Sequence, residues 1–435
     1  MLLFISDIHL TDRTAFQYSL NKDAVKKVFF NNLVSILERR PKVKDLTLVL
    51  LGDFFDLIRT KEWWVIRDGN WEPKKVTPWS ENQDGIEEIA LKILNGIFKN
   101  NKSFIEEIKT LPYRLSNKFP KIKFEKIIYI PGNHDRLITL QPLWNVVEGF
   151  FENIMLIKNG FFTPKDYKTL AFHGHQLDIF NREEREVPPF GDYTSSLITA
   201  IPYLIETEMS IKGFSRDIIE SLKKRMLKID DIRPESEIIP WLLSEAKKEA
   251  SLKDFFKEFI FKVLEMVTVD PFIRRWVDAH SKEFGIKDEL FDLFLRVKGP
   301  KIFPLWGAKI FTLRYLERLS NSLRSRDGGD PYVNKLLKAC NLEFSEKNMP
   351  YEFEIQEHMR DAECIVMGHT HGAKFVPLTS KVFYLNTGTW GKYMTQTISG
   401  DGFVSSRNLT FVIIYKEEEY KDRRFELWNV MDNKQ

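Results

Sequence analysis

Five polar motifs, each placed directly after a short apolar run, constrain this chain more than any other feature. The apolar runs cover residues 2–5, 46–51, 125–130, 168–172 and 362–367. Their length and their content of Val, Ile, Leu and Phe predict buried strands. Apolar residues at helical spacing between residues 21 and 40 separate the first two runs, and this order of strand, helix and strand predicts a parallel pair. Since open α/β sheets bind ligands at the carboxyl ends of their strands, we expect the motifs to converge there.

The motifs are rich in potential metal ligands. Six of the eight histidines in the chain lie in them, at positions 9, 134, 173, 175, 369 and 371. Asp7 precedes His9 by two positions, so an extended backbone would project both side chains to one side. Asp53 and Asn133 add oxygen donors, and no motif contains a cysteine. Oxygen and imidazole donors without thiolate suit Mn²⁺, Fe or Zn²⁺.

Composition narrows the class of protein. Of 435 residues, 43% are hydrophobic and 29% charged, as in an ordinary globular protein, and 65 basic residues nearly balance 62 acidic ones. Nucleic acid is therefore not an expected partner. The two cysteines, Cys340 and Cys364, fit a reducing compartment. A strand that begins at residue 2 leaves no room for a signal peptide, and no apolar run reaches the about 20 residues of a membrane span, so we expect a cytoplasmic protein.

The hydrophobic pattern of the sequence changes from strand-like to helical and back again, and these two changes predict the domain organisation. From about residue 180 to about residue 351 the pattern is helical, with a clear amphipathic stripe between Phe255 and Val267. Strand-like runs return at residue 362, and residues 409–415 and 424–430 resemble a closing hairpin. We therefore expect an α/β catalytic domain in two pieces, residues 1–180 and 358–435, that is interrupted by an all-α insertion at residues 181–357.

A loop between Leu57 and Asp84 contains four tryptophans without a regular period. It either folds back on the core or forms an exposed lip for a substrate or a membrane. We favour the first interpretation. We also expect His280 and His358, which lie outside the motifs, on the surface, and Arg136 in solvent, with phosphate contact as its alternative.

The five motifs together resemble those of the calcineurin-like metallophosphoesterase superfamily. They read Asp7-x-His9, Gly52-Asp53-x-x-Asp56, Gly132-Asn133-His134-Asp135, His173-Gly174-His175 and Gly368-His369-Thr370-His371. The resemblance covers roughly residues 1–180 and 360–392. It implies a β-sandwich flanked by helices and a metal-dependent hydrolase that cleaves a phosphoester or pyrophosphate bond by in-line attack of a metal-bridging hydroxide.

The resemblance also implies a role for each motif residue. One divalent ion, expected to be Mn²⁺, would be held by Asp7, His9 and His371, and the second by Asn133, His173 and His369, with Asp53 bridging the two. His134 would give a proton to the leaving group, with Asp135 as the residue that orients or charges it. Asp56 and His175 are weaker candidates for orienting ligands, and Asp56 is also a candidate turn residue.

Three runs are similar to a branch of the family, the UDP-2,3-diacylglucosamine pyrophosphatases. They are Asp7-Ile-His-Leu, Gly52-Asp-Phe-Phe-Asp and His173-Gly-His-Gln-Leu-Asp. This similarity implies a small-molecule or lipid-linked phosphoester as substrate and peripheral contact with a membrane. The chain departs from the branch at His134, where the branch often has arginine, and in its larger insertion.

Two other functions stay open at this point. The metal site could serve as a noncatalytic scaffold whose insertion docks a partner, although no ligand position has been lost. A nuclease of the same superfamily would need a basic groove with interleaved aromatic residues, and the nearly neutral insertion offers none. The sequence does not determine the oligomeric state.

Overall fold

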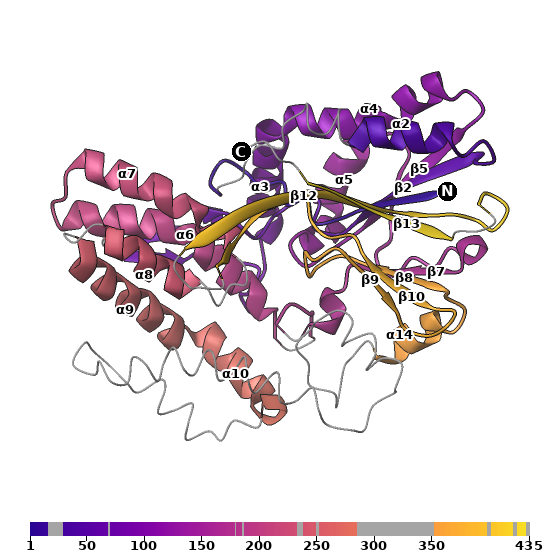
Figure 1. Cartoon of the computed structure of the whole chain (residues 1–435). Helices are drawn as coiled ribbons and strands as arrows, with labels where there is room; N and C mark the ends of the chain where they lie inside the picture. The colour runs from indigo at the N-terminus through magenta and orange to yellow at the C-terminus, as the bar shows by residue number, and fades with distance from the viewer. Residues whose placement is uncertain are drawn as a thin grey trace.

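The structure is a computed structural model (Figure 1), and its described part has several gaps. The described residues are 1–15, 29–67, 70–178, 180–184, 187–232, 238–248, 252–284, 352–397, 402–420 and 424–431. Cys340 and most of the second half of the predicted insertion lie outside them.

The larger sheet has seven strands, in the order β11-β12-β1-β2-β5-β6 with β13 beside β12. Four of its strands are parallel: β1 (Leu2–Ile5), β2 (Asp45–Leu51), β5 (Lys123–Ile130) and β6 (Ile154–Leu156). The parallel pairing of β1 with β2 is the one that the sequence predicts. The other three are antiparallel: β11 (Lys392–Gln396), β12 (Phe403–Ile414) and β13 (Phe425–Met431). The predicted closing hairpin therefore joins the sheet that the first residues of the chain begin.

The second sheet has four strands, in the order β7-β8-β10-β9. They are β7 (Thr169–Ala171), β8 (Cys364–Met367), β9 (Lys374–Pro377) and β10 (Phe383–Asn386). Side-chain alternation on the strands explains how the two sheets pack. On β1, Leu2 and Phe4 join a core cluster that also contains Val366 and Leu385 of the second sheet, whereas Leu3 and Ile5 face the helices. The two sheets thus form the expected sandwich.

Helices cover both outer faces of the sandwich (Figure 1). The larger sheet is covered by α2 (Asn31–Glu38), α3 (Ile86–Asn100), α4 (Lys102–Lys118) and α5 (Gln141–Phe150). On the second sheet, α14 (Glu352–Met359) buries Ile355 and Met359 against Phe172 and Ile365. The α/β fold class expected from the sequence is confirmed.

The described residues from 190 to 284 form a group of helices beside the sandwich (Figure 1). They are α6 (Phe190–Ile211), α7 (Arg216–Met226), α8 (Ile238–Lys248), α9 (Lys253–Val269) and α10 (Pro271–Phe284). On α9, Phe255, Phe256, Phe259 and Ile260 of the predicted stripe are buried. Within the described residues, no helix combines the length and the apolar character needed to cross a membrane. The division of the chain into domains stays a prediction.

The tryptophan-rich loop folds back on the core, as expected. Trp63, Trp64 and Trp79 are buried, and Trp64 Nε1 donates a hydrogen bond of 2.9 Å to Ser196 Oγ on α6. The loop also contains a short hairpin, β3 (Trp64–Arg67) and β4 (Asn70–Pro73), that the sequence pattern did not indicate. Its strands have four residues each, too few to show a period.

Candidate metal centre

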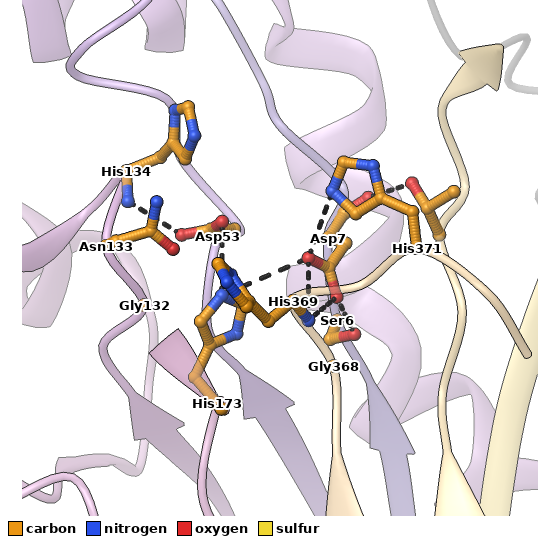
Figure 2. A network of polar contacts seen from close by, with 12 residues as sticks. Ser6, Asp7, Asp53, Gly132, Asn133, His134, His173, Gly368, His369 and His371 are labelled. Carbon is orange, nitrogen blue, oxygen red and sulfur yellow. Dashed lines mark hydrogen bonds and ion pairs between the residues drawn. The ribbon is translucent and has the colours of Figure 1, made fainter. Parts of the chain in front are cut away.

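The site lies where the strands of both sheets end. Asp7, Asp53 and Asn133 follow β1, β2 and β5 of the larger sheet. His173 and His369 follow β7 and β8 of the second sheet. Figure 2 shows these side chains directed toward a common centre, with Asn133 and Asp53 on one side and Asp7 and His371 on the other. Residues from both ends of the chain therefore meet here, as the motifs predict.

Sharp turns place the side chains at this centre. Asp7, His9, Asp53, His369 and His371 all adopt the left-handed backbone conformation, with φ between +50° and +67°. This conformation is uncommon for residues other than glycine, and it is concentrated at functional sites. The expectation of an extended backbone from Asp7 to His9 is therefore wrong, because each strand ends in a turn. The first two turns are joined by hydrogen bonds from Asp7 N to Gly52 O (3.1 Å) and from His9 N to Asp53 O (2.8 Å).

Two glycines permit this close approach. A Cβ on Gly52 would overlap the ring of His173, and the positive φ of Gly52 (+82°) also favours glycine. A Cβ on Gly132 would overlap the carboxylate and the backbone nitrogen of Asp53. Glycine at these two positions therefore lets the turns after β2 and β5 come close to His173 and Asp53.

One group of candidate ligands consists of Asp7, His9 and His371. His371 Nε2 lies 3.3 Å from Asp7 Oδ1 and 3.0 Å from His9 Nε2. His9 Nδ1 lies 2.9 Å from Asp56 Oδ2, so Asp56 holds the Nδ1–H tautomer and leaves Nε2 with a lone pair. Burial and the nearby Arg59 guanidinium lower the pKa of His9 to about 3. His9 is therefore neutral, which is the form that binds a metal.

A second group consists of Asp7, Asp53 and His173. His173 Nε2 lies 3.2 Å from Asp53 Oδ2 and 4.0 Å from Asp7 Oδ1, and its Nδ1 is 2.9 Å from Leu51 O. Burial by itself lowers the pKa of His173, but the carboxylates of Asp53 and Asp7 outweigh burial and raise it to about 10. Two fully buried carboxylates thus need positive charge next to them, which a divalent cation also provides.

Asn133 gives an independent indication of a ligand. Its Nδ2 donates a hydrogen bond of 3.2 Å to Asn181 Oδ1, whereas its Oδ1 is buried and has no hydrogen-bond partner among the described residues. An unsatisfied buried oxygen costs about 1–3 kcal/mol. Amide oxygens are ligands for divalent cations, so this atom fits the expected metal.

His369 contacts both sheets of the site. Its backbone nitrogen donates to both carboxylate oxygens of Asp7, at 3.1 Å each. Its Nε2 lies 2.9 Å from Asp178 Oδ2, which leaves Nδ1 as the ring nitrogen available to a cation. Asp178 was not among the predicted site residues. It is the last residue of the His173-Gly-His-Gln-Leu-Asp run, and this run was the signal that could have identified it.

The structure corrects the residue that orients His134. His134 Nδ1 lies 3.1 Å from Asp56 Oδ1, whereas Asp135 turns away from the ring. The Asp135 carboxylate instead accepts hydrogen bonds from Gly132 N (2.6 Å), Phe54 N (2.9 Å) and the Tyr129 hydroxyl (2.5 Å). Asp135 thus holds the turn that carries His134, and Asp56 orients the ring.

Charge keeps His134 protonated. Burial opposes the charged ring, but Asp56 and Asp53 outweigh burial and raise the pKa of His134 to about 9. The side chain is 13% exposed, so a substrate can reach it. Asp56 also accepts hydrogen bonds from the backbone nitrogens of Ile58 (3.2 Å) and Arg59 (2.8 Å), so both of its predicted roles, in a turn and beside a ligand, are observed.

Four other residues named in the sequence analysis lie as follows. His280 is buried rather than exposed, with its ring stacked on Trp276 at 4.2 Å between centroids. Arg136 is not free in solvent, because it forms a partly buried ion pair with Asp192 of α6. His175 is buried, and its Nδ1 has no hydrogen-bond partner among the described residues, so no hydrogen bond from this atom orients a ligand. His358 is half-buried, with its ring 5.4 Å from that of Phe161.

Comparison with known families agrees with the geometry. A family model, described as calcineurin-like phosphoesterase, matches residues 1–198, which include the first four motifs. The search of curated proteins found no match to this chain. The fifth motif lies outside the matched residues, yet His369 bonds directly to Asp7 within them. Residues 1–198 therefore match the calcineurin-like phosphoesterase family, which implies a metal-dependent phosphohydrolase.

Proposed function

We propose that this protein hydrolyses a phosphoester or pyrophosphate bond with the help of two divalent cations. One observation carries the proposal. The Nε2 atoms of His173 and His371 lie 3.2–4.0 Å from carboxylate oxygens of Asp7 or Asp53. These four residues come from distant parts of the chain. Asp7 and Asp53 are both buried beside imidazoles at the ends of two sheets, and such clusters of titratable groups are typical of functional sites.

The proposed ligand sets follow the family pattern. Asp7, His9 and His371 would hold one ion, and Asn133, His173 and His369 the other, with Asp53 between them. The unsatisfied Oδ1 of Asn133 and the lone pair on His9 Nε2 support this assignment. Mn²⁺ is the proposed metal, with Fe or Zn²⁺ as alternatives, because all the donors are oxygen or imidazole nitrogen.

The two cations, when bound, supply Lewis acidity and lower the pKa of water toward neutrality. The chain's own residues do the rest. Protonated His134 gives its Nε2 proton to the leaving oxygen, while Asp56 holds Nδ1 and so fixes the direction of the ring. Asp56 stays ionised, since His134 and Arg59 hold its pKa well below the usual range although burial raises it.

For the substrate we propose a small-molecule or lipid-linked phosphoester. The His173-Gly-His-Gln-Leu-Asp178 run, which is similar to that of the UDP-2,3-diacylglucosamine pyrophosphatases, supports this class, and the small net charge of +3 gives no support to nucleic acid. A panel of nucleotide-sugar lipids, cyclic nucleotides and phosphoproteins would separate the possibilities.

The test is hydrolysis of p-nitrophenyl phosphate and of its bis ester by protein loaded with Mn²⁺. Replacing a residue behind a metal ligand costs about 10- to 100-fold in activity, so Asp53→Asn should cost at least about 100-fold. The matched control is Asp217→Asn, the same change at an exposed position on α7, which should retain full activity. An active Asp53→Asn enzyme would remove the mechanism. Binding of Mn²⁺ without turnover across the whole panel would instead favour the noncatalytic scaffold.

A further inference from the structure

We infer that Asp178 and Asn181 are positioning residues, which align Asn133 and His369 for the second cation and connect that site to the helices of residues 190–284. This inference rests on the proposed function, because it concerns how the proposed ligands are held. It adds two residues that neither the sequence motifs nor the family match assigns a role.

Four hydrogen bonds form the connection. His369 Nε2 lies 2.9 Å from Asp178 Oδ2, and Asn181 Nδ2 donates to the same oxygen at 2.6 Å. Asn181 Oδ1 then accepts from Asn133 Nδ2 at 3.2 Å, and the backbone nitrogen of Phe180 donates to Asp178 Oδ1 at 2.9 Å. A continuous path therefore joins two proposed ligands that are more than 200 residues apart in the sequence.

These hydrogen bonds determine which atom of each proposed ligand is available to the cation. Asp178 Oδ2 accepts a hydrogen bond from His369 Nε2, which leaves the lone pair of the ring on Nδ1. Asn181 donates to Asp178, so its oxygen is left to face the Asn133 amide. That contact fixes the Asn133 Nδ2 group on the Asn181 side and directs the unsatisfied Oδ1 away from it. A flipped amide would present hydrogens, which cannot bind a cation.

The other end of the path lies against the helices. The backbone nitrogen of Gly191, in the first turn of α6, donates to Phe180 O at 2.7 Å. A Cβ at Gly191 would overlap Asn181 Oδ1, so α6 approaches this side chain closely. From the opposite direction, Phe180 stacks on Trp276 of α10, with 5.5 Å between ring centroids. Phe180 and Asn181 are therefore held between the proposed ligands and two helices.

The experiment measures both Mn²⁺ binding events by isothermal titration calorimetry. Asp178→Asn replaces an oxygen that accepts two hydrogen bonds by a side chain with one acceptor oxygen, and it should weaken one of the two Mn²⁺ sites by about 10- to 100-fold. The other site should keep its affinity. His371→Ala, which removes a proposed ligand of the first ion, should weaken the site that Asp178→Asn spares.

Two further variants test this hydrogen-bonded path while they keep the charge of Asp178. Asn181→Ala removes the middle of the path and should reproduce the selective loss. Gly191→Ala places a methyl group against Asn181 Oδ1 and should do the same from α6, whereas Gly149→Ala on α5, where a Cβ would meet nothing within 4 Å, should change neither site. The melting temperatures of the metal-free variants should not correlate with their losses of Mn²⁺ affinity.

The outcomes separate this inference from the proposed function. Unchanged affinities in Asp178→Asn and Asn181→Ala, or equal losses at both sites, would overturn the inference and leave the hydrolase intact. A wild-type protein that binds fewer than two Mn²⁺ ions would overturn the proposed function, and the inference with it.

Discussion

Asp56 contacts three side chains with different roles. Its oxygens lie 2.9 Å from His9 Nδ1 and 3.1 Å from His134 Nδ1, and Arg59 Nε donates to it at 2.6 Å. His9, a proposed ligand, is neutral, whereas His134, the proposed acid, is charged. One carboxylate thus fixes the ring direction of both histidines, and the different surroundings of the two rings set their charges.

If His134 donates a proton, its loss should depend on the leaving group. His134→Gln should slow hydrolysis of phenyl phosphate by about 10²- to 10⁴-fold, because phenolate is basic and needs the proton. p-Nitrophenolate leaves readily without a proton, so p-nitrophenyl phosphate should lose far less. The measurement is kcat for both esters in both proteins. Equal losses for the two esters would show that His134 does not act as the acid.

Cys364 should be chemically inert in the folded protein. Its side chain is buried in β8, and burial raises the pKa of the thiol to about 12, so at pH 8 it is neither ionised nor accessible. In a Cys340→Ser background, a thiol reagent such as 5,5′-dithiobis(2-nitrobenzoate) should label no cysteine at pH 8 in the native state and one after unfolding in guanidinium. Rapid labelling of the native protein would contradict the buried position.

At this scale the sequence predicts the proposed ligands well and their supporting residues poorly. A ligand such as Asp53 is recognisable because it follows an apolar run within a local motif. Asp135 was assigned to His134 because the two are neighbours in sequence, but consecutive residues in this turn point in different directions. The contact of Asp178 with His369 joins two distant segments of the chain, so the helical or strand pattern around Asp178 does not reveal it.

Secondary structure is predicted best where the local hydrophobic pattern of a strand or helix is sufficient to identify it. The short apolar runs of β1 and β2 give the correct strands from the sequence. The boundary between α3 and α4, which meet at Asn101, is less evident from the sequence. Asn101 Nδ2 donates to Thr11 O at 2.8 Å. This break depends on a contact with a distant segment, which the helical period cannot reveal.

The turns after the strands should not tolerate a side chain at Gly132. Gly132→Ala would drive a methyl group into the Asp53 carboxylate and backbone, so it should lower the free energy of unfolding and weaken Mn²⁺ binding. Gly149→Ala is the matched control, since the same methyl group on α5 meets no neighbour and should stabilise the protein by about 0.5–1 kcal/mol. Urea unfolding and calorimetry measure both effects. A fully active, equally stable Gly132→Ala protein would contradict the close approach.

The whole molecule is held together where its two ends meet. Residues 1–10 contribute β1 and the first motif, and residues 364–414 contribute β8, β10 and β12, which pack on or pair with these first residues. The order of the motifs predicts this closure, because five strand ends must share one site. The sequence does not predict how residues 190–284 dock on the sandwich, since that depends on contacts such as Trp64 with Ser196.

Because the proposed ions join both sheets, their removal should destabilise the entire fold. A ligand that binds the native state at 100 times its Kd adds about 2.7 kcal/mol to the free energy of unfolding. Calorimetric melting of wild-type protein in Mn²⁺ should therefore give a higher Tm than melting in EDTA. In Asp53→Asn this difference should largely vanish, because the shared carboxylate charge is gone, whereas Asp217→Asn should keep it. A wild-type Tm that is the same in Mn²⁺ and in EDTA would mean that the buried Asp7 and Asp53 are satisfied by the neighbouring histidines alone.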